Sequence, residues 1–264
     1  MNQPPKNSAG RALLWIGRGV AIELIRRKDL YVLFLLMAVF VVGALAVNLV
    51  GIDNPSTATF LLNLGLTLAY VFAHVLTLLL AARQLPTEIE NRTIYPLLAR
   101  PISRETLLLG KWGACTACGV LVFVPLFLMG WIAVPKLEAY DPALLVQALA
   151  LQVVSLGLTA ALALGLSLVV QKGVAIALTG GLLFFGHSLF GFIQSVIAEN
   201  RFSTIFRWLT LYVPDFSKLS LLTRYTDGVG AVSITTFAGL LVYGTLFSIV
   251  TLAFSSLAFR RRAL

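Results

Sequence analysis

The sequence predicts an all-α integral membrane protein with six transmembrane helices in a single domain, residues 1–264. Hydrophobic residues make up 59% of the chain and charged residues only 12%, a balance that the surface of a soluble protein does not show. Six apolar runs reach the length of about 20 residues that a helix needs to cross a bilayer. These predicted spans lie at residues 30–50, 60–82, 113–134, 143–170, 174–198 and 236–259.

The segment before the first span, residues 1–29, predicts a tail followed by an amphipathic helix between Arg11 and Lys28. Its apolar face is formed by Leu13, Ile16, Val20 and Leu24, and its basic face by Arg11, Arg18 and Arg26. Such a helix lies on an anionic membrane surface, and we expect it to bend near Asp29 into the first span. The alternative is a merely charged tail. The first apolar run is longer than the core of a signal peptide, so we expect no cleavable signal.

The distribution of basic residues predicts the side of the membrane on which each loop lies. With the N-terminus inside, fifteen of the twenty Lys and Arg residues fall on the inner side and five on the outer side. Inner loops carry the excess of Lys and Arg, so we expect both termini and residues 83–112 to be cytoplasmic. The net charge of +9 is then an orientation signal. Because no basic stripe is interleaved with exposed aromatic residues, we expect no nucleic-acid partner.

Residues 83–112 form a polar segment between the second and third spans. Pro86 cannot continue a helix from upstream, and Thr87 and Glu90 have the spacing of a capping box, which marks the start of a helix. The sequence therefore predicts that the second span ends before Pro86 and that a short amphipathic helix begins at Thr87. Ser103 is placed to cap the next helix, which enters the third span. A segment with this many helix signals indicates a docking surface.

The outer segment, residues 199–235, predicts short amphipathic helices. One apolar face is shared by Phe202, Phe206, Leu209 and Val213. Pro214 ends this helix, and a second helix is expected over 218–225. The segment either rests on the outer leaflet or dips into the membrane, since both arrangements need the same pattern.

Spans four and five are joined by a very short turn at Lys172 and Gly173, which predicts an antiparallel hairpin. Both spans carry small residues at four-residue spacing, which let helices approach closely in membranes. The two stripes are Gly157, Ala161 and Gly165, and Gly173, Ala177 and Gly181. We expect these stripes to pack the hairpin rather than to form a ligand groove.

A few polar side chains fall within the predicted spans. His74 and His187 are candidates for a functional role, because ionisable residues inside membranes are usually functional. A neutral His bonded to a neighbouring helix is the commoner case, so we expect packing. Asn63, Gln152 and Gln194 can bond between helices in the same way. No carboxylate lies in any predicted span, which argues against a proton or sodium relay.

Several kinds of chemistry lack their sequence signatures. No GxxxxGK[ST] phosphate-binding loop occurs, so we expect no ATP hydrolysis by that route. Cys115 and Cys118 form a CxxC pair in the third span, but no further Cys or His lies nearby, so we expect packing thiols and no bound metal. Glu88 and Glu90 are two residues apart on a helix and point in different directions, which suits joint acid–base work poorly.

The polar segment contains, in this order along the chain, an acidic residue, a Thr, a Leu-Leu pair, Pro-Ile-Ser-Arg and Gly-Lys. The matching residues are Glu90, Thr93, Leu97–Leu98, Pro101–Arg104 and Gly110–Lys111. This pattern resembles the cytoplasmic loop of ABC transporter permeases of the type-2 exporter class (the ABC-2 family). Arg92 stands where Gly is common, and this variant is most similar to the branch of multicopper-enzyme-maturation permeases.

The resemblance implies the permease subunit of an ATP-driven exporter in the inner membrane of a prokaryote. It implies a homodimer or heterodimer surrounded by membrane lipids, with ATP and Mg²⁺ bound by a separate ATPase subunit and no cofactor bound by this chain. It also implies a coupling helix in the 83–112 loop and short outer helices that cap the exit of the pathway. The implied coupling and ATPase-contact residues are Glu88, Glu90, Arg92, Thr93, Pro101, Ser103 and Arg104. The polar residues available to a pathway are His74, His187, Asn63, Gln152 and Gln194.

Two other functions stay open at the level of sequence. One is an integral membrane enzyme that modifies lipids, with His74 or His187 as its catalytic residue. The missing partner carboxylate in the spans argues against it. The other is a membrane scaffold for assembly of a periplasmic enzyme, using the segment 199–235.

Overall fold

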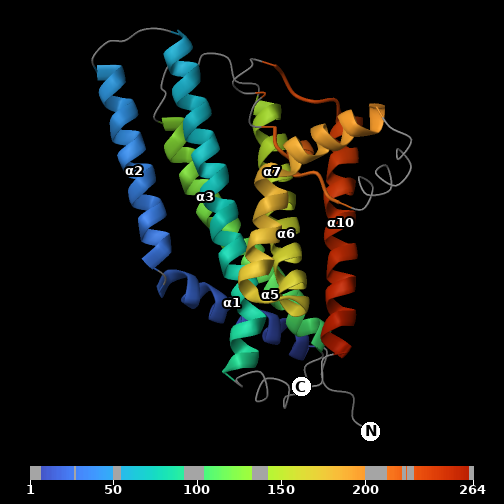
Figure 1. The fold of residues 1–264 in the computed structure, drawn as a ribbon. Coiled ribbons are helices and arrows are strands. Elements are labelled where there is room, and N and C mark those ends of the chain that lie inside the picture. Colours follow the sequence, from blue (N-terminus) through green and yellow to red (C-terminus); the bar gives the residue numbers. More distant parts are fainter. Residues whose placement is uncertain are drawn as a thin grey trace.

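The computed structural model describes residues 7–26, 28–49, 55–91, 104–132, 142–199, 213–221, 224 and 229–261. Within these residues the protein is all-helical, with long α-helices and one short 3₁₀ helix, η1 (Phe216–Leu219). Most of the long helices lie side by side in one bundle, and α1 lies across one end of it (Figure 1). The all-α prediction is confirmed for this part of the chain.

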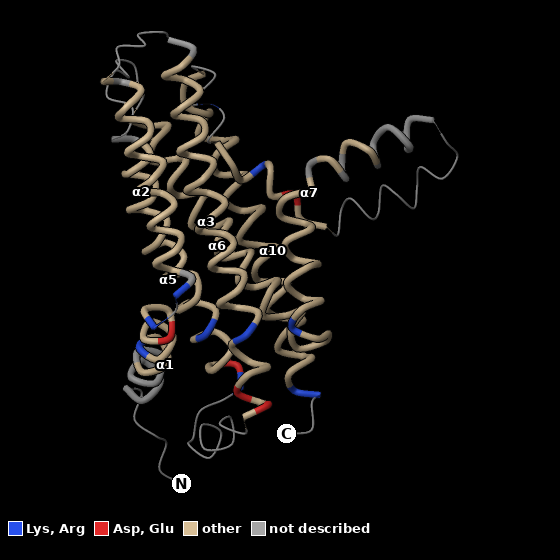
Figure 2. Tube along the Cα trace, turned by 60° about the vertical axis from the view of Figure 1, so that its left-hand side comes forward, with Lys and Arg blue, Asp and Glu red and all other residues tan. Residues whose placement is uncertain are grey.

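Five of the described helices are long and apolar enough to cross a membrane. They are α2 (Lys28–Leu49), α3 (Pro55–Glu90), α5 (Arg104–Ile132), α6 (Pro142–Val169) and α10 (Ile234–Arg261). A further helix, α7 (Lys172–Glu199), is apolar over the shorter stretch Lys172–Gly186, and its last turns lean away from the bundle (Figure 1, Figure 2). Five of the six predicted spans are therefore matched by helices of spanning length. The remaining one, the predicted span 174–198, is not confirmed.

The amphipathic helix α1 (Asn7–Arg26) turns its apolar face toward the bundle. Val20 and Leu24 are buried, and the helix packs against α5. Trp15 lies on the exposed side, with 69% of its surface accessible. The predicted apolar face thus covers protein, and contact between α1 and the membrane surface stays a prediction. The chain changes direction between α1 and α2, close to the bend predicted near Asp29 (Figure 1).

The predicted break at Pro86 is wrong, because α3 continues through this residue for one more turn. The amide of Asn91 donates to the carbonyl of Thr87 at 3.0 Å, so Thr87 lies in the last turn of α3 and begins no new helix. A proline inside a helix costs about 3 kcal/mol or more, since a hydrogen bond is lost and the ring crowds the preceding turn. Here only one turn follows it, and the neighbouring Leu85 is fully buried in the bundle. The rest of the predicted coupling helix, 92–103, lies outside the described residues.

The hairpin of α6 and α7 is confirmed, with its turn slightly earlier than predicted. Residues 170 and 171 form the turn, whereas Lys172 and Gly173 already belong to the first turn of α7. The two helices pack against each other. Because α6 also packs against α3, α5 and α10, it is the central helix of the bundle.

The small residues of α6 face α5 and α10 instead of α7. A Cβ atom at Gly157 would lie 3.5 Å from the Trp112 ring of α5, and one at Gly165 would meet the Ser255 hydroxyl of α10. At Gly173 and Gly181 of α7, a Cβ atom would meet nothing within 4 Å. For these four glycines, the prediction that the two stripes pack the hairpin is therefore wrong. In a helix that packs against several others, small residues lie where a neighbouring helix comes closest, and here those neighbours are α5 and α10.

The 3₁₀ helix η1 lies where the sequence predicts a second outer helix over 218–225. The Asp215 carboxylate accepts from the Ser217 amide at 3.0 Å and caps the start of η1. Ser220 has extended backbone, so the predicted helix does not run through it. A side chain that bonds its own backbone two residues on favours such a tight turn over a longer helix. The predicted apolar face at 202–213 lies outside the described residues except for Val213.

Candidate functional site

Charged residues gather at the end of the bundle where α3 ends and α5 begins (Figure 2). We call this the loop end, because residues 92–103 connect the two helices here, and we call the opposite end the far end. α1 lies across the loop end, and α10 finishes there (Figure 1). Side chains at the loop end can therefore join several helices to the base of this connection.

Lys111 of α5 is the centre of a polar network at the loop end. Its side chain is 3% exposed; its Nζ lies 2.6 Å from Glu88 Oε1 and donates to Gln84 Oε1 at 3.1 Å. The Gln84 amide in turn donates to Glu23 Oε2 of α1 at 2.6 Å. Gln84 and Glu88 are four residues apart on α3 and share one face, so both reach the same ammonium group. These four residues, the loop-base network, join α1, α3 and α5 beside the connection 92–103.

The burial of Lys111 explains what the loop-base network does. A buried ion pair adds little net stability, but it becomes costly when one partner is withdrawn, because the other charge is left uncompensated. Any movement that separates α3 from α5 at this point would separate Lys111 from Glu88 and leave a buried charge without compensation. The network therefore holds the two helices in a fixed relation.

A second contact at the loop end joins α5 to the C-terminal end of α10. Arg104 Nη1 donates to the carbonyl of Phe259 at 3.1 Å and to that of Arg260 at 3.4 Å. Its guanidinium also lies 5.7 Å from the centre of the Phe259 ring. The last carbonyls of a helix have no partner within the helix, and Arg104 supplies one. Glu105 adds an ion pair with Arg260.

A third contact joins α3 to α7. Glu90 Oε2 lies 3.1 Å from Lys172 Nζ, and both side chains are about half exposed. Exposed pairs of this kind contribute about 0–1 kcal/mol. The bond between Glu90 and Lys172 can therefore be broken, and replaced by a bond to another group, at little cost in stability.

The predicted coupling residues are only partly described. Glu88, Glu90 and Arg104 all have partners within this chain. The other four, Arg92, Thr93, Pro101 and Ser103, lie outside the described residues. No sequence pattern singles out Gln84 or Glu23, and Lys111 stands out in the sequence only as part of the loop pattern. The available signal is the place of Lys111, only two residues before the apolar run 113–134 and therefore close to the buried part of the bundle.

His74 of α3 is fully buried and has partners on both ring nitrogens. Nδ1 lies 2.9 Å from the carbonyl of Tyr70, and Nε2 lies 3.0 Å from Ser155 Oγ on α6. A carbonyl only accepts, so Nδ1 carries the proton and Nε2 accepts from the Ser155 hydroxyl, as in a neutral imidazole. The amide nitrogen of Gln152 lies 3.3 Å from Nδ1, but both groups are donors in this assignment, so this contact adds no hydrogen bond. This geometry agrees with the packing hypothesis, since the cluster joins α3 to α6.

The other polar candidates do not join this cluster. Asn63 Oδ1 accepts from the Thr67 hydroxyl at 3.4 Å on the exposed side of α3, so its bond lies within one helix and not between two. His187 and Gln194 lie on α7, but their side chains are outside the described part of the structure.

The thiols of Cys115 and Cys118 are both buried and form no disulfide. Among the described residues, no group of three His, Cys, Asp or Glu side chains is placed to hold a metal ion. The two cysteines belong to the apolar core that α5 shares with its neighbours.

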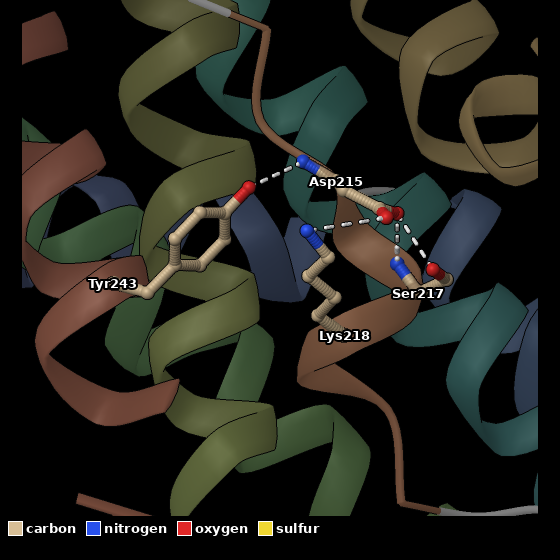
Figure 3. Close-up of polar contacts among 4 residues, drawn as sticks. All are labelled: Asp215, Ser217, Lys218 and Tyr243. Carbon is tan, nitrogen blue, oxygen red and sulfur yellow. Dashed lines mark hydrogen bonds and ion pairs between the residues drawn. The ribbon is translucent and has the colours of Figure 1, made fainter. Parts of the chain in front are cut away.

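At the far end, η1 packs against α6, α7 and α10; we call residues 213–221, which include η1, the far-end segment. The Asp215 amide donates to the Tyr243 hydroxyl of α10 at 2.8 Å, and its carboxylate accepts from the Ser217 hydroxyl at 2.6 Å (Figure 3). Lys218 Nζ lies 4.0 Å from Asp215 Oδ2 and 5.5 Å from the centre of the Tyr243 ring. Leu219, next along, is buried.

The start of α10 is also fixed at the far end. Gln147 of α6 donates from Nε2 to the carbonyl of Val232 at 2.9 Å, and the Val232 amide donates back to Gln147 Oε1 at 2.9 Å. A side-chain amide paired in both directions satisfies two backbone groups at once. The far end is therefore joined by hydrogen bonds between α6, α10 and the far-end segment.

Comparison with known proteins identifies the family. A family model described as "ABC-2 family transporter protein" matches residues 23–186, which is more than half of the chain. No curated protein matches the sequence. Members of this family are membrane subunits that do not hydrolyse ATP themselves and typically bind no cofactor, and the family implies an ATPase partner subunit. Together with its helices of membrane-spanning length, this match shows that the chain belongs to the ABC-2 family and is the membrane permease component of such a transporter.

Proposed function

We propose that this permease belongs to an exporter in the inner membrane of a prokaryote, with ATP and Mg²⁺ bound by the separate ATPase subunit. Two permeases, identical or related, form the pathway and are surrounded by lipid. The charge bias supports cytoplasmic termini and a cytoplasmic loop end. In this arrangement α7 supplies the span predicted at 174–198, which completes the six, and α1 lies at the cytoplasmic membrane surface. The Arg92 variant of the loop supports placement in the branch of multicopper-enzyme-maturation permeases.

The observation that carries the coupling proposal is the loop-base network beside residues 92–103. Both ends of this connection enter helices that Lys111 and Glu88 tie together. Coupling between distant sites passes through packed helices and bonded networks that keep their shape. A push on residues 92–103 is therefore shared by α3 and α5, and by α1 through Gln84. Movement of these helices would switch the pathway between inward and outward states.

The proposed ATPase contact is the connection 92–103, with Arg92 and Thr93 as its candidate residues. Glu88 faces Lys111 and supports the connection from within the chain. Glu90 is more exposed, and its weak bond to Lys172 leaves it available to a partner. The loop thus divides into a supporting base and a contacting tip.

Replacement of residues 92–100 by a Gly/Ser linker of equal length tests this division. It leaves Glu88, Lys111 and Arg104 in place but removes Arg92 and Arg100. We expect normal membrane insertion because the apolar spans are unchanged and thirteen of the fifteen inner Lys and Arg residues remain. The ATPase should no longer co-purify with the tagged permease from native membranes. The matched control replaces residues 50–54, which join α2 to α3 at the far end, by the same kind of linker and should retain the ATPase. Normal ATPase recovery and transport with the 92–100 linker would disprove the coupling proposal.

A further inference from the structure

We propose that Arg104 is a positioning residue that couples the loop to the far-end segment, through the continuous helix α10. This inference rests on the proposed function for its energy source, because the movement starts where the ATPase contacts 92–103. It assigns Arg104 a role inside the permease instead of a contact with the ATPase. The residues that carry it lie at the two ends of α10.

At the loop end, Arg104 holds the last turn of α10. It is the first residue of α5, directly after the connection 92–103, so any displacement of that connection reaches it at once. It donates hydrogen bonds to the backbone carbonyls of Phe259 and Arg260, and its guanidinium lies over the Phe259 ring. A planar guanidinium can satisfy two acceptors and stack on a ring at the same time, which an ammonium group cannot. The attachment is therefore to the helix itself and not only to a flexible side chain.

At the far end, α10 holds the far-end segment in place. The Tyr243 hydroxyl accepts from the amide of Asp215 at 2.8 Å. The next residue, Gly244, has no side chain, and a methyl group of Val154 on α6 and the methyl groups of Leu219 share that space. The Leu219 methyl groups lie 3.1 and 3.3 Å from where a Cβ atom would lie. A displacement of α10 at this level removes the surface against which Leu219 is buried.

The helix between these two contacts is continuous. α10 runs unbroken from Ile234 to Arg261, and its sequence contains no proline, whereas α3 and α5 each contain one. Tyr243 and Phe259 are separated by about 24 Å at a rise of 1.5 Å per residue. Along this distance α10 packs chiefly against α6, and it approaches α5 less closely. A pull at Arg104 can therefore tilt α10 against α6 and loosen the far-end segment.

Maleimide labelling of a buried position in the far-end segment tests the proposal. Leu219→Cys is the reporter, because Leu219 is 1% exposed. Ser217→Cys, on an exposed residue of the same 3₁₀ helix, is the matched control that should label in every state. The permease–ATPase complex is placed in lipid nanodiscs, and labelling is followed without nucleotide and with ATP plus vanadate. The parent chain gives the background from the buried Cys115 and Cys118.

We expect ATP plus vanadate to change the labelling rate of Leu219→Cys. Adding Arg104→Gln should reduce this change at least about fivefold, the lower limit of typical coupling between sites. Arg104→Lys should restore part of it, since an ammonium can reach one of the two carbonyls. Arg261→Gln removes a nearby positive charge without altering either carbonyl and should leave the response unchanged. Bound ATPase is measured in every sample.

Three results would overturn the proposal. One is a full ATP response in Leu219→Cys with Arg104→Gln. Another is loss of the ATPase in the Arg104→Gln protein, which would make Arg104 an ATPase contact. The third is no ATP response of Leu219→Cys in the otherwise unchanged chain. Tyr243→Phe gives an independent check if Arg104→Gln does not fold. It removes the hydroxyl that accepts from the Asp215 amide, so it should raise the labelling rate of Leu219→Cys without nucleotide. An unchanged labelling rate in this variant would be a fourth result that refutes the proposal.

Discussion

The two members of the Lys111–Glu88 pair are predicted to have unequal effects when each is removed. The Lys111 side chain is 3% exposed, whereas that of Glu88 is 26% exposed. In Glu88→Ala the ammonium stays buried with only the Gln84 oxygen at 3.1 Å, and an uncompensated buried charge costs about 3–5 kcal/mol. In Lys111→Met the carboxylate can turn toward water, so the loss is that of charge-assisted hydrogen bonds, about 1–3 kcal/mol.

The double variant Glu88→Ala/Lys111→Met is the decisive sample. It removes both charges, and replacing both partners of a buried pair by apolar groups is often nearly neutral. We therefore expect it to be more stable than Glu88→Ala alone. Equilibrium unfolding in mixed detergent micelles with increasing SDS, monitored by tryptophan fluorescence, measures all four proteins, and their double-mutant cycle gives the interaction energy of the pair.

Two outcomes of this cycle would refute the reasoning. Equal losses in the two single variants would mean that the burial of Lys111 does not set the cost. A double variant as unstable as Glu88→Ala would mean that the charge of Lys111 is not what Glu88 compensates. Either result would remove the loop-base network as the support of the 92–103 connection.

Two further predictions concern packing within the membrane. His74→Gln should keep ATPase activity and transport near normal because Gln can still bond Ser155 or Tyr70. His74→Leu should lose about 1–3 kcal/mol of stability because the bond between the imidazole and the Ser155 hydroxyl, which joins α3 to α6, is lost. A folded His74→Gln permease that binds its ATPase but cannot transport would contradict the packing role. Gly130→Ala should destabilise by about 1–3 kcal/mol, as overpacking typically does, because its Cβ would lie 3.1 Å from the Gly65 backbone carbon. Gly181→Ala, with nothing within 4 Å, should stabilise by up to about 1 kcal/mol, and the same sign for both glycine variants in SDS unfolding would disprove this account.

The placement of the five long apolar helices follows from the sequence because the bilayer imposes a length and an apolar composition on each span. The break at Pro86 was mispredicted for a physical reason. Local helix signals describe an isolated segment, but the last turn of α3 is stabilised by contacts with α5 and α7 that no local signal contains. Tertiary packing outweighs the cost of one proline near a helix end.

The candidate site shows the same limit. The pattern in residues 83–112 points to the end of the bundle at which charged residues of α1, α3, α5 and α10 gather. It could not show that Gln84 bridges Glu23 to Lys111, since these residues come from three helices separated by many positions. Spacing along one helix predicts a shared face, whereas the partner of that face depends on how the helices pack. The misassigned glycine stripes of α6 and α7 have the same cause.

The placement of hydrogen bonds within the membrane indicates which helix is free to move. α3 and α6 are joined by the bond between His74 and Ser155, so sliding one past the other would strand buried polar groups. The serine and threonine hydroxyls of α10 from Thr245 to Ser256 instead bond within their own helix: those of Ser248 and Ser255, for example, donate to carbonyls four residues earlier. Movement of α10 against α6 therefore breaks no hydrogen bond between them along most of its length. Gln147 holds the chain just before α10 at the far end, so displacement at Arg104 tilts the helix about this point, and the level of Tyr243 moves with it.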